Sequence, residues 1–438
     1  MTPAPSPPAP PASPAPAFDD ASEDFARHRD AADPLATFRE RFLIPRRPDG
    51  SDVIYLCGNS LGLQPKHART LVMEELDDWA SLAVEAHFEG RRPWYPYHEV
   101  VRGGLARLVG AREHEVVAMN SLTVNLHLMM VSFYRPTRQR FRVLMESPAF
   151  PSDTYAVCSH VACRGFDPRD AVIEVSPRPG EHLIREDDIE QVLRERGDSI
   201  ALVLLGGVNF LSGQVLDMPR LTRAAHHAGA MIGFDLAHAV GNVPLALHEW
   251  DVDFACWCSY KYLNSGPGAV AGCFIHERHA RDVTLPRYGG WWGNDPATRF
   301  RMHLEHEFRP VPTADGWQLS NPPILALAPV KASLDLFDEA GMAALRVKSD
   351  GLTPYLRWLI ERERPEWFEV ITPRETVARG CQLSILVHDR PRERFKALTS
   401  AGVVCDFREP NVIRVAPAPL YNTFLDAWRF ARALTELR

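Results

Sequence analysis

Hydrophobic residues in the middle of the chain form short continuous runs separated by longer segments with helical spacing. The short runs predict strands buried on both faces. They lie at Val116–Met119, Arg142–Glu146, Ile200–Leu205, Met231–Phe234, Phe254–Cys258 and Ala269–Ile275. Helical spacing follows Pro65 and covers Pro219–His227. The alternation predicts an α/β fold with a mostly parallel sheet covered by helices on both faces.

The pattern changes after about residue 322. Two long helical segments, Ile324–Asp338 and Met342–Glu361, come before short strand-like runs, and an amphipathic helix at Phe424–Leu437 ends the chain. The strand-like runs are Phe368–Thr372, Gln382–Val387, Val403–Asp406 and Val412–Ala416. This succession of helical segments and short strands predicts a smaller α+β domain.

The predicted division of the chain has four parts. Residues 1–20 form a Pro/Ala-rich tail that we expect to be disordered. Residues 21–62 form an N-terminal arm, residues 63–322 a large domain and residues 323–438 a small C-terminal domain. The first basic residue is Arg27, which argues against a signal or transit peptide.

Composition narrows the function classes. The chain has 438 residues and a net charge of −7, so it lacks the basic footprint of a nucleic-acid-binding protein. No apolar run approaches the roughly 20 residues that cross a bilayer, so we expect no membrane span. Eight scattered cysteines, several in apolar runs, predict reduced, buried thiols in a cytoplasmic protein. Cys256 and Cys258 have no second pair at zinc-site spacing, so no metal is predicted.

One acid and one lysine carry the chemistry that the sequence predicts. Asp235 ends an apolar run in Gly233-Phe-Asp235-Leu-Ala-His238, and Lys261 follows the next run, 26 residues later. Pyridoxal phosphate needs a lysine amine for covalent attachment and an acid that keeps its pyridine nitrogen protonated. Of the 49 basic residues only five are lysines, and Lys261 alone follows such an acid-bearing strand. The pair therefore predicts a pyridoxal phosphate site.

Two further segments have residues that suit the phosphate group and the ring of this cofactor. Asn120-Ser-Leu122-Thr123 follows a predicted strand and opens a helix, whose free N–H groups suit a phosphate. Phe150, just past another strand, either stacks on the cofactor ring or is a buried aromatic side chain in a turn. Arg414 lies inside an apolar run, where a buried guanidinium group needs an anion as its partner.

That anion is either a substrate carboxylate or an internal acid.

Four longer strings resemble the kynureninase family, which is a family of fold-type-I pyridoxal phosphate hydrolases. They are Phe234-Asp235-Leu-Ala-His238-Ala-Val-Gly-Asn, Trp257-Cys-Ser-Tyr260-Lys261-Tyr-Leu-Asn, Ser320-Asn321-Pro-Pro-Ile and Arg414-Val-Ala-Pro-Ala-Pro-Leu-Tyr-Asn. The resemblance runs from about Tyr55 to the C-terminus. It implies an aspartate aminotransferase-like fold and a homodimer with shared active sites.

The resemblance also implies roles for particular residues. Lys261, Tyr260 and Asp235 are the implied catalytic residues. The implied cofactor contacts are Leu122, Thr123, Phe150, Pro151, Ser152, Asp153, Asp235, His238, Tyr260 and Lys261, with Trp291 and Asn321 reaching the site from the partner subunit. The implied substrate contacts are Ser60, His87, Ser320, Asn321 and Arg414. One departure is Gly206, which stands where animal members have a serine that contacts the cofactor.

The implied activity is hydrolysis of the Cβ–Cγ bond of L-kynurenine or 3-hydroxy-L-kynurenine. The products are anthranilate or 3-hydroxyanthranilate and L-alanine, in tryptophan catabolism and NAD biosynthesis. The set His87, Ser320 and Asn321 resembles members that prefer the 3-hydroxy substrate.

Two alternatives stand beside this activity. One is a class V aminotransferase or a cysteine desulfurase, the latter with Cys381 as its nucleophile. The other is a non-enzymatic protein that binds pyridoxal phosphate.

Overall fold

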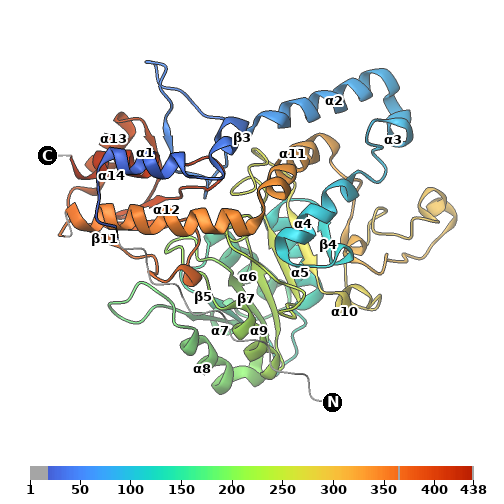
Figure 1. The fold of residues 1–438 in the computed structure, drawn as a ribbon. Coiled ribbons are helices and arrows are strands. Elements are labelled where there is room, and N and C mark those ends of the chain that lie inside the picture. Colours follow the sequence, from blue (N-terminus) through green and yellow to red (C-terminus); the bar gives the residue numbers. More distant parts are fainter. Residues whose placement is uncertain (1–17, 364–365, 437–438) are drawn as a thin grey trace, which may run out of the picture.

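A computed structural model of the chain describes residues 18–363 and 366–436 (Figure 1). Residues 1–17, most of the predicted tail, lie outside the described residues. Phe18, at the end of that tail, packs against Tyr355 of α12 (Met342–Glu363) with ring centroids 5.3 Å apart. Phe18 is therefore packed, although the composition assigned it to the tail.

A seven-stranded sheet forms the centre of the molecule. In spatial order its strands are β4 (Val116–Ala118), β10 (Gly272–Ile275), β9 (Phe254–Trp257), β8 (Met231–Asp235), β7 (Ile200–Gly206), β5 (Arg142–Glu146) and β6 (Val172–Val175). The pairs from β9 to β6 are parallel, and β10 runs antiparallel to both of its neighbours. The predicted mostly parallel sheet is confirmed.

Alternating side chains of the central strands enter two separate cores. On β7, Val203 and Leu205 pack into one core, whereas Leu202 and Leu204 pack into the other. The first core includes residues of α4 (Arg102–Val109), α8 (Glu186–Arg196), α9 (Met218–His227) and α11 (Ile324–Ala340). The second includes residues of α5 (Leu122–Phe133), α6 (Pro151–Cys163) and α10 (Glu277–Ala280). Apolar runs without polar alternation are what two buried faces require.

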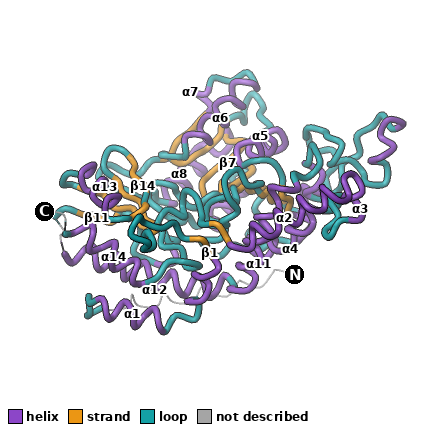
Figure 2. The backbone as a smooth tube through the Cα atoms, turned by 90° about the horizontal axis from the view of Figure 1, so that it is seen from above, coloured by secondary structure: helices purple, strands orange, loops and turns teal. Residues whose placement is uncertain are grey.

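A smaller antiparallel sheet lies at the other end of the molecule. Its strands, in spatial order, are β11 (Phe368–Val370), β12 (Leu383–Val387), β15 (Val412–Val415) and β14 (Asp406–Arg408). The core under this sheet is closed by α12, α13 (Pro391–Ser400) and α14 (Phe424–Thr435), and Ala26 of α1 (Glu23–Ala31) also packs into it. In Figure 2 α1, α12 and α14 lie side by side at this end. The N-terminal arm is thus part of the small-sheet layer.

Two strand predictions need correction. The run Val403–Asp406 is not one strand, because β13 (Val403–Val404) pairs with β2 (Ile54–Tyr55) and Asp406 begins β14 in the other sheet. Strand β6 was not predicted, since Val172–Val175 is a short edge strand with Glu174 exposed. The remaining strands and α-helices are β1 (Phe42–Leu43), β3 (Gln64–Pro65), the 17-residue α2 (Lys66–Leu82), α3 (Ala86–Glu89) and α7 (Pro168–Ala171). Among the described residues, no helix is long and apolar enough to span a membrane.

A buried acid ties the sheet together at the end opposite Lys261. Asp253, just before β9, accepts hydrogen bonds from the Ile232 N–H at 2.7 Å and from His279 Nε2 at 2.7 Å. His226 Nε2 lies 3.0 Å from the same carboxylate, and Arg278 donates to it at 2.5 Å. Burial raises the pKa of Asp253, but the hydrogen bonds outweigh it and leave the pKa below its ordinary value. The charged form is therefore the one that the fold stabilises.

We expect Asp253→Asn to lower the free energy of unfolding by about 3 kcal/mol, because the amide keeps one of the two acceptor oxygens, turns a donor toward one of the bound donors and has no charge to pair with Arg278. Denaturant unfolding of both proteins measures the change, with the exposed Asp198→Asn as the control. The stabilisation by Asp253 is present above about pH 4 and is lost as the pH falls through its lowered pKa. Equal stability of wild type and Asp253→Asn at pH 7 would contradict this account.

Candidate active site

Parallel pairing of β8 and β9 brings the predicted acid and lysine together. Asp235 is the last residue of β8, and Lys261 lies four residues beyond the end of β9. Both are buried, with exposed fractions of 7% and 9%. Asp235 Oδ1 accepts a hydrogen bond from the Ala237 N–H at 2.7 Å, which fixes the carboxylate. The carboxyl end of the parallel strands is where ligands of such sheets bind.

His238 is the direct partner of the lysine. Its Nε2 lies 2.9 Å from Lys261 Nζ. Burial and the neighbouring charge of Lys261 hold the pKa of His238 well below its ordinary value, so the ring is neutral. A neutral ring accepts at Nε2 and carries its proton on Nδ1, which has no partner within the protein. The lysine therefore has a neighbour that can take a hydrogen bond without adding charge.

The start of α5 provides an anion site at the same edge. Helix α5 begins at Leu122, and Ser121 before it makes no side-chain capping bond. The first N–H groups of a helix have no acceptor within the helix, and the Ser121 side chain does not accept one of them here. Thr123 Oγ1 lies 2.9 Å from Ser152 Oγ of α6, which adds two hydroxyls beside these N–H groups. The arrangement matches what a phosphate needs.

Three aromatic side chains and a second acid complete the walls. Phe150 meets the ring of Phe210 edge-on, with centroids 5.5 Å apart, and Lys261 Nζ lies 5.7 Å from the Phe150 ring centre. Burial, with Cys258 nearby, raises the pKa of Tyr260 well above its ordinary value. Burial also raises the pKa of Asp153, and the negative charge of Asp235 raises it further.

These groups enclose a cavity of about 150 Å³. Nine of the predicted cofactor residues line it: Leu122, Thr123, Phe150, Ser152, Asp153, Asp235, His238, Tyr260 and Lys261. Pro151 begins α6 and is exposed outside the lining. Sequence reasoning missed Ser121, Glu146, Val208, Phe210 and Ala237, which also line the cavity. For Glu146 the signal was available, because it ends an apolar strand as Asp235 does.

Arg414 lies behind the cavity wall and does not line it. Its Nε donates to Asp406 Oδ2 at 2.5 Å, and its Nη1 donates to the Phe210 carbonyl. Asp406 and Arg414 are directly opposite on neighbouring strands, so their register creates the ion pair. Of the two anions that the sequence left open, the structure supplies the internal acid, and binding of a substrate carboxylate stays a prediction.

The N-terminal arm runs along the lysine loop. The Gly62 N–H donates to the Tyr260 carbonyl at 2.8 Å. A Cβ at position 62 would lie 2.3 Å from the Lys261 carbonyl oxygen, so only glycine permits this approach. Ser60 is exposed in the same loop. The arm therefore supports the Lys261 loop and presents Ser60 nearby.

Two of the other predicted residues, His87 and Trp291, lie in a projecting lobe formed by residues 83–95 and 288–309, in which Phe88, Tyr95 and Phe300 contact one another. His87 is on α3, and Trp291 packs edge-on against Trp292 with centroids 4.7 Å apart. Ser320 and Asn321 are exposed and follow Leu319, whose backbone a Cβ at Gly290 would meet at 2.2 Å. This lobe is at the right of Figure 1 and lines no part of the Lys261 cavity. None of these four residues lines the Lys261 cavity of its own chain.

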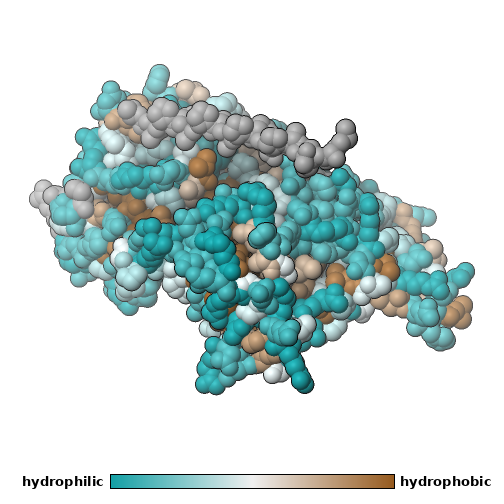
Figure 3. Space-filling model, turned by 90° about the horizontal axis from the view of Figure 1, so that it is seen from below, coloured by the Kyte–Doolittle hydropathy of each residue, from teal (hydrophilic) through white to brown (hydrophobic). Residues whose placement is uncertain are grey.

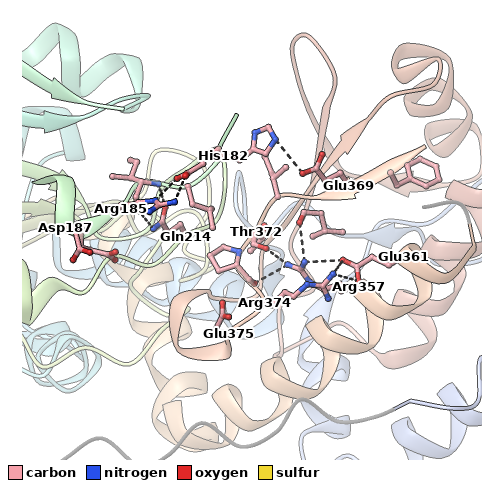
Figure 4. A pocket seen from close by; sticks show the side chains of 18 of the residues that line it. His182, Arg185, Asp187, Gln214, Arg357, Glu361, Glu369, Thr372, Arg374 and Glu375 are labelled. Carbon is pink, nitrogen blue, oxygen red and sulfur yellow. Dashed lines mark hydrogen bonds and ion pairs between the residues drawn. The ribbon is translucent and has the colours of Figure 1, made fainter. Parts of the chain in front are cut away.

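A groove larger than this cavity lies elsewhere in the described chain and has a different character. It measures about 1230 Å³ and lies between residues 181–187 and the region around β11 (Figure 4). Its charges are paired with one another, such as His182 with Glu369 at 3.6 Å and Arg374 with Glu361 at 2.9 Å. Neither the lysine nor the acid of the predicted site lines it.

One cluster has the residue types of a metal site. Ligand atoms of Glu115, His248 and His276 lie within 4.8 Å of one another. Glu115 already accepts hydrogen bonds from the backbone N–H groups of Arg112 and Glu277, and His248 Nδ1 lies 2.9 Å from it. The cluster is therefore a hydrogen-bonded network that joins β10 to the start of β4.

The residues of the cavity fit pyridoxal phosphate. Lys261 and Asp235 supply the amine and the acid, while the α5 N-terminus, Thr123 and Ser152 supply donors for a phosphate. Buried polar atoms without a partner in the protein, His238 Nδ1 and Asp153 Oδ1, remain available for a polar ligand. An apolar ligand would leave these groups unsatisfied.

Comparison with known sequences agrees with this chemistry. The family described as kynureninase C-terminal domain matches residues 345–434, and aminotransferase class-V matches residues 54–378. Kynureninase of Myxococcus xanthus is 55% identical over 94% of this chain and 96% of its own length. Kynureninase of Koribacter versatilis is 54% identical over 94% of this chain and 97% of its own length.

Comparison with solved structures shows the fold. The cysteine desulfurase CsdA of Escherichia coli superposes with a TM-score of 0.73 and 16% identity, covering 92% of this chain and 98% of its own. A lysine-to-alanine mutant of C-DES, with glycine covalently linked to its pyridoxal phosphate cofactor, superposes with a TM-score of 0.72 and 15% identity, covering 90% and 98%. At such identities the likeness concerns the fold alone.

The geometry around Lys261 and the relatives' identity over nearly the whole chain lead to one conclusion. This chain belongs to the kynureninase family of fold-type-I enzymes, whose cofactor is pyridoxal phosphate.

Proposed function

We propose that this protein hydrolyses the Cβ–Cγ bond of L-kynurenine or its 3-hydroxy derivative, releasing L-alanine and anthranilate or 3-hydroxyanthranilate. The observation that carries the proposal is the buried Lys261–His238 pair beside Asp235, in a chain 55% identical to a kynureninase. Tryptophan breakdown and NAD biosynthesis are the pathways in which we place the reaction. The free state of all eight cysteines supports a cytoplasmic location.

Pyridoxal phosphate, when bound, supplies an electron sink for a carbanion beside the amino-bearing carbon of the substrate. Lys261 is the residue that would hold it covalently, and Asp235 would pair with its ring nitrogen. Lys261 Nζ is also the group placed to take and return a proton, because neutral His238 accepts its hydrogen bond at 2.9 Å. Burial keeps the Tyr260 hydroxyl protonated near neutral pH, so Tyr260 acts as a donor.

The shared-site homodimer is part of this proposal. The projecting lobe exposes large apolar side chains: Val84 at 68%, Phe88 at 58%, Phe300 at 60% and Leu304 at 67%. Figure 3 shows brown side chains at this right-hand end. An apolar groove of about 710 Å³, lined by Leu43, Met73 and Leu325 among others, adjoins the loop after Lys261. A second copy covering this surface would bring His87, Trp291, Ser320 and Asn321 to the partner's cavity.

The domain division is also proposed, with one adjustment. The seven-stranded sheet lies within residues 63–322 and the four-stranded sheet within residues 323–438. Residues 21–62 associate with the small sheet through α1 and β2. A desulfurase role is not favoured, because Cys381 is fully buried and burial raises its pKa to about 12.

Purified protein supplied with L-kynurenine should release alanine and fluorescent anthranilate in equal amounts. Lys261→Ala should abolish this release and also the cofactor link that borohydride traps, since no other lysine lines the cavity. Mass spectrometry of the reduced wild type identifies the labelled lysine. A label on Lys331 or Lys348, or a wild type that forms no anthranilate, would defeat the proposal.

Arg414→Gln should raise KM or lower kcat/KM for the substrate, with loss of a charge-assisted contact costing on the order of 2–5 kcal/mol. Asp406→Asn is the matched control, because it removes the other half of the same ion pair. A substrate clamp predicts that only Arg414→Gln impairs catalysis. If both variants instead lose cofactor and stability to the same extent, Arg414 has a structural role only.

The enzyme should prefer 3-hydroxykynurenine over kynurenine, by about tenfold or less in kcat/KM, the value of one partly hydrated hydrogen bond. His87 and Asn321 carry the polar groups that would bind the ring hydroxyl. Steady-state kinetics with both substrates measures the ratio, and His87→Ala should reduce it. A clear preference for kynurenine would show that these residues do not set specificity.

A further inference from the structure

A third buried acid shares the cavity with Asp235 and Asp153. Glu146 is the last residue of β5, is 4% exposed and lines the cavity that contains Lys261. Its Oε1 accepts a hydrogen bond from the Gly206 N–H at 2.9 Å. Its Oε2 is buried and has no hydrogen-bond partner among the residues that the structure describes. Burial of such an oxygen atom costs free energy unless it carries a proton or contacts a polar ligand.

Gly206 provides the space that this carboxyl group occupies. A Cβ at position 206 would lie 2.8 Å from Glu146 Oε1, closer than side-chain carbons approach. Gly206 is not among the residues with positive φ, so its backbone conformation does not demand glycine. The contact with Glu146 is therefore the physical reason for a glycine here. The serine of animal family members would collide with the carboxyl group in this arrangement.

The charges of the cavity do not balance if every acid is ionised. Only Lys261 offsets the three carboxyl groups among the lining residues, because His238 is neutral. Burial, opposed by the Gly206 N–H and aided by the charge of Asp235, raises the pKa of Glu146 to about 7. Proton exchange at one acid near neutral pH is thus expected. The titratable groups that line the cavity with Glu146 are Asp153 of α6, Asp235 at the end of β8, His238 after β8, and Tyr260 and Lys261 after β9.

We propose that Glu146 is a positioning residue. Its protonation state determines how much negative charge the pocket places beside Asp235 and Lys261. The inference rests on the proposed function only in that Lys261 carries the cofactor. Ionised Glu146 adds an anion beside a cationic site and favours the proton on the nitrogen that links Lys261 to the cofactor. Protonated Glu146 removes that effect, so the acid couples solution pH to the charge of the site.

The test is a pH titration of the holoenzyme. The absorbance of the bound cofactor reports the protonation of the nitrogen that links it to Lys261, and the midpoint of this titration is the quantity compared. Glu146→Gln should lower the midpoint by about one pH unit, because a neighbouring negative charge is lost. Glu146→Asp retains the charge and should keep the midpoint nearer to that of the wild type. Glu174→Gln, on the adjacent strand and exposed, is the control and should leave it unchanged.

Gly206→Ala gives an independent measurement, since its methyl group would displace the Glu146 carboxyl group without removing it. Its midpoint should fall in the same direction as that of Glu146→Gln. If Glu146→Gln fails to retain cofactor, the midpoints of Gly206→Ala and Glu146→Asp decide. Midpoints equal to the wild type in the variants that bind cofactor, with only thermal stability lowered, would overturn the proposal. The titration needs no substrate, so its failure is separable from failure to release anthranilate.

Discussion

The site depends on one structural constraint, the parallel pairing of β8 with β9. Because the two strands run in the same direction, Asp235 at the end of one and the Lys261 loop beyond the other reach the same edge of the sheet. Strands β5 and β7, parallel to them, deliver Glu146 and Gly206 to that edge as well. An antiparallel arrangement would send alternate loops to opposite ends of the sheet. The topology thus concentrates three acids and one lysine in a single cavity.

Such a concentration of charge is costly, and the surrounding structure offsets it with few groups. Asp235 takes the Ala237 N–H and Glu146 takes the Gly206 N–H, while neutral His238 accepts the hydrogen bond of Lys261. At the other end of the sheet, Asp253 is satisfied fully by charged and backbone donors. The difference is functional. Groups that are satisfied within the protein stabilise the fold, whereas partly satisfied groups keep affinity for a polar ligand.

Much of the site could be predicted because its signals are local in sequence. An acid or lysine after an apolar run, and a helix start after a strand, need only short segments to identify Asp235, Lys261 and Thr123. Long-range register could not be read in this way. The Arg414–Asp406 pair arises because β14 and β15 are antiparallel neighbours, and the same change of partner splits Val403–Asp406 between two sheets. The proximity of Glu146 to Gly206, 60 residues apart, likewise requires the sheet order.

The projecting lobe differs from the rest of the chain in that several of its large apolar side chains are exposed. Its aromatic side chains pack on one another, with Phe88 against Tyr95 at 6.0 Å and Tyr95 against Trp292 at 5.3 Å, yet Phe88 and Phe300 stay more than half exposed. A monomer gains nothing from leaving such side chains in water. The lobe also holds His87 and Trp291, which the resemblance assigns to the site but which line no part of this chain's own cavity. The homodimer proposed above would account for both features, because a second copy would bury the aromatic side chains and bring its cavity to His87 and Trp291.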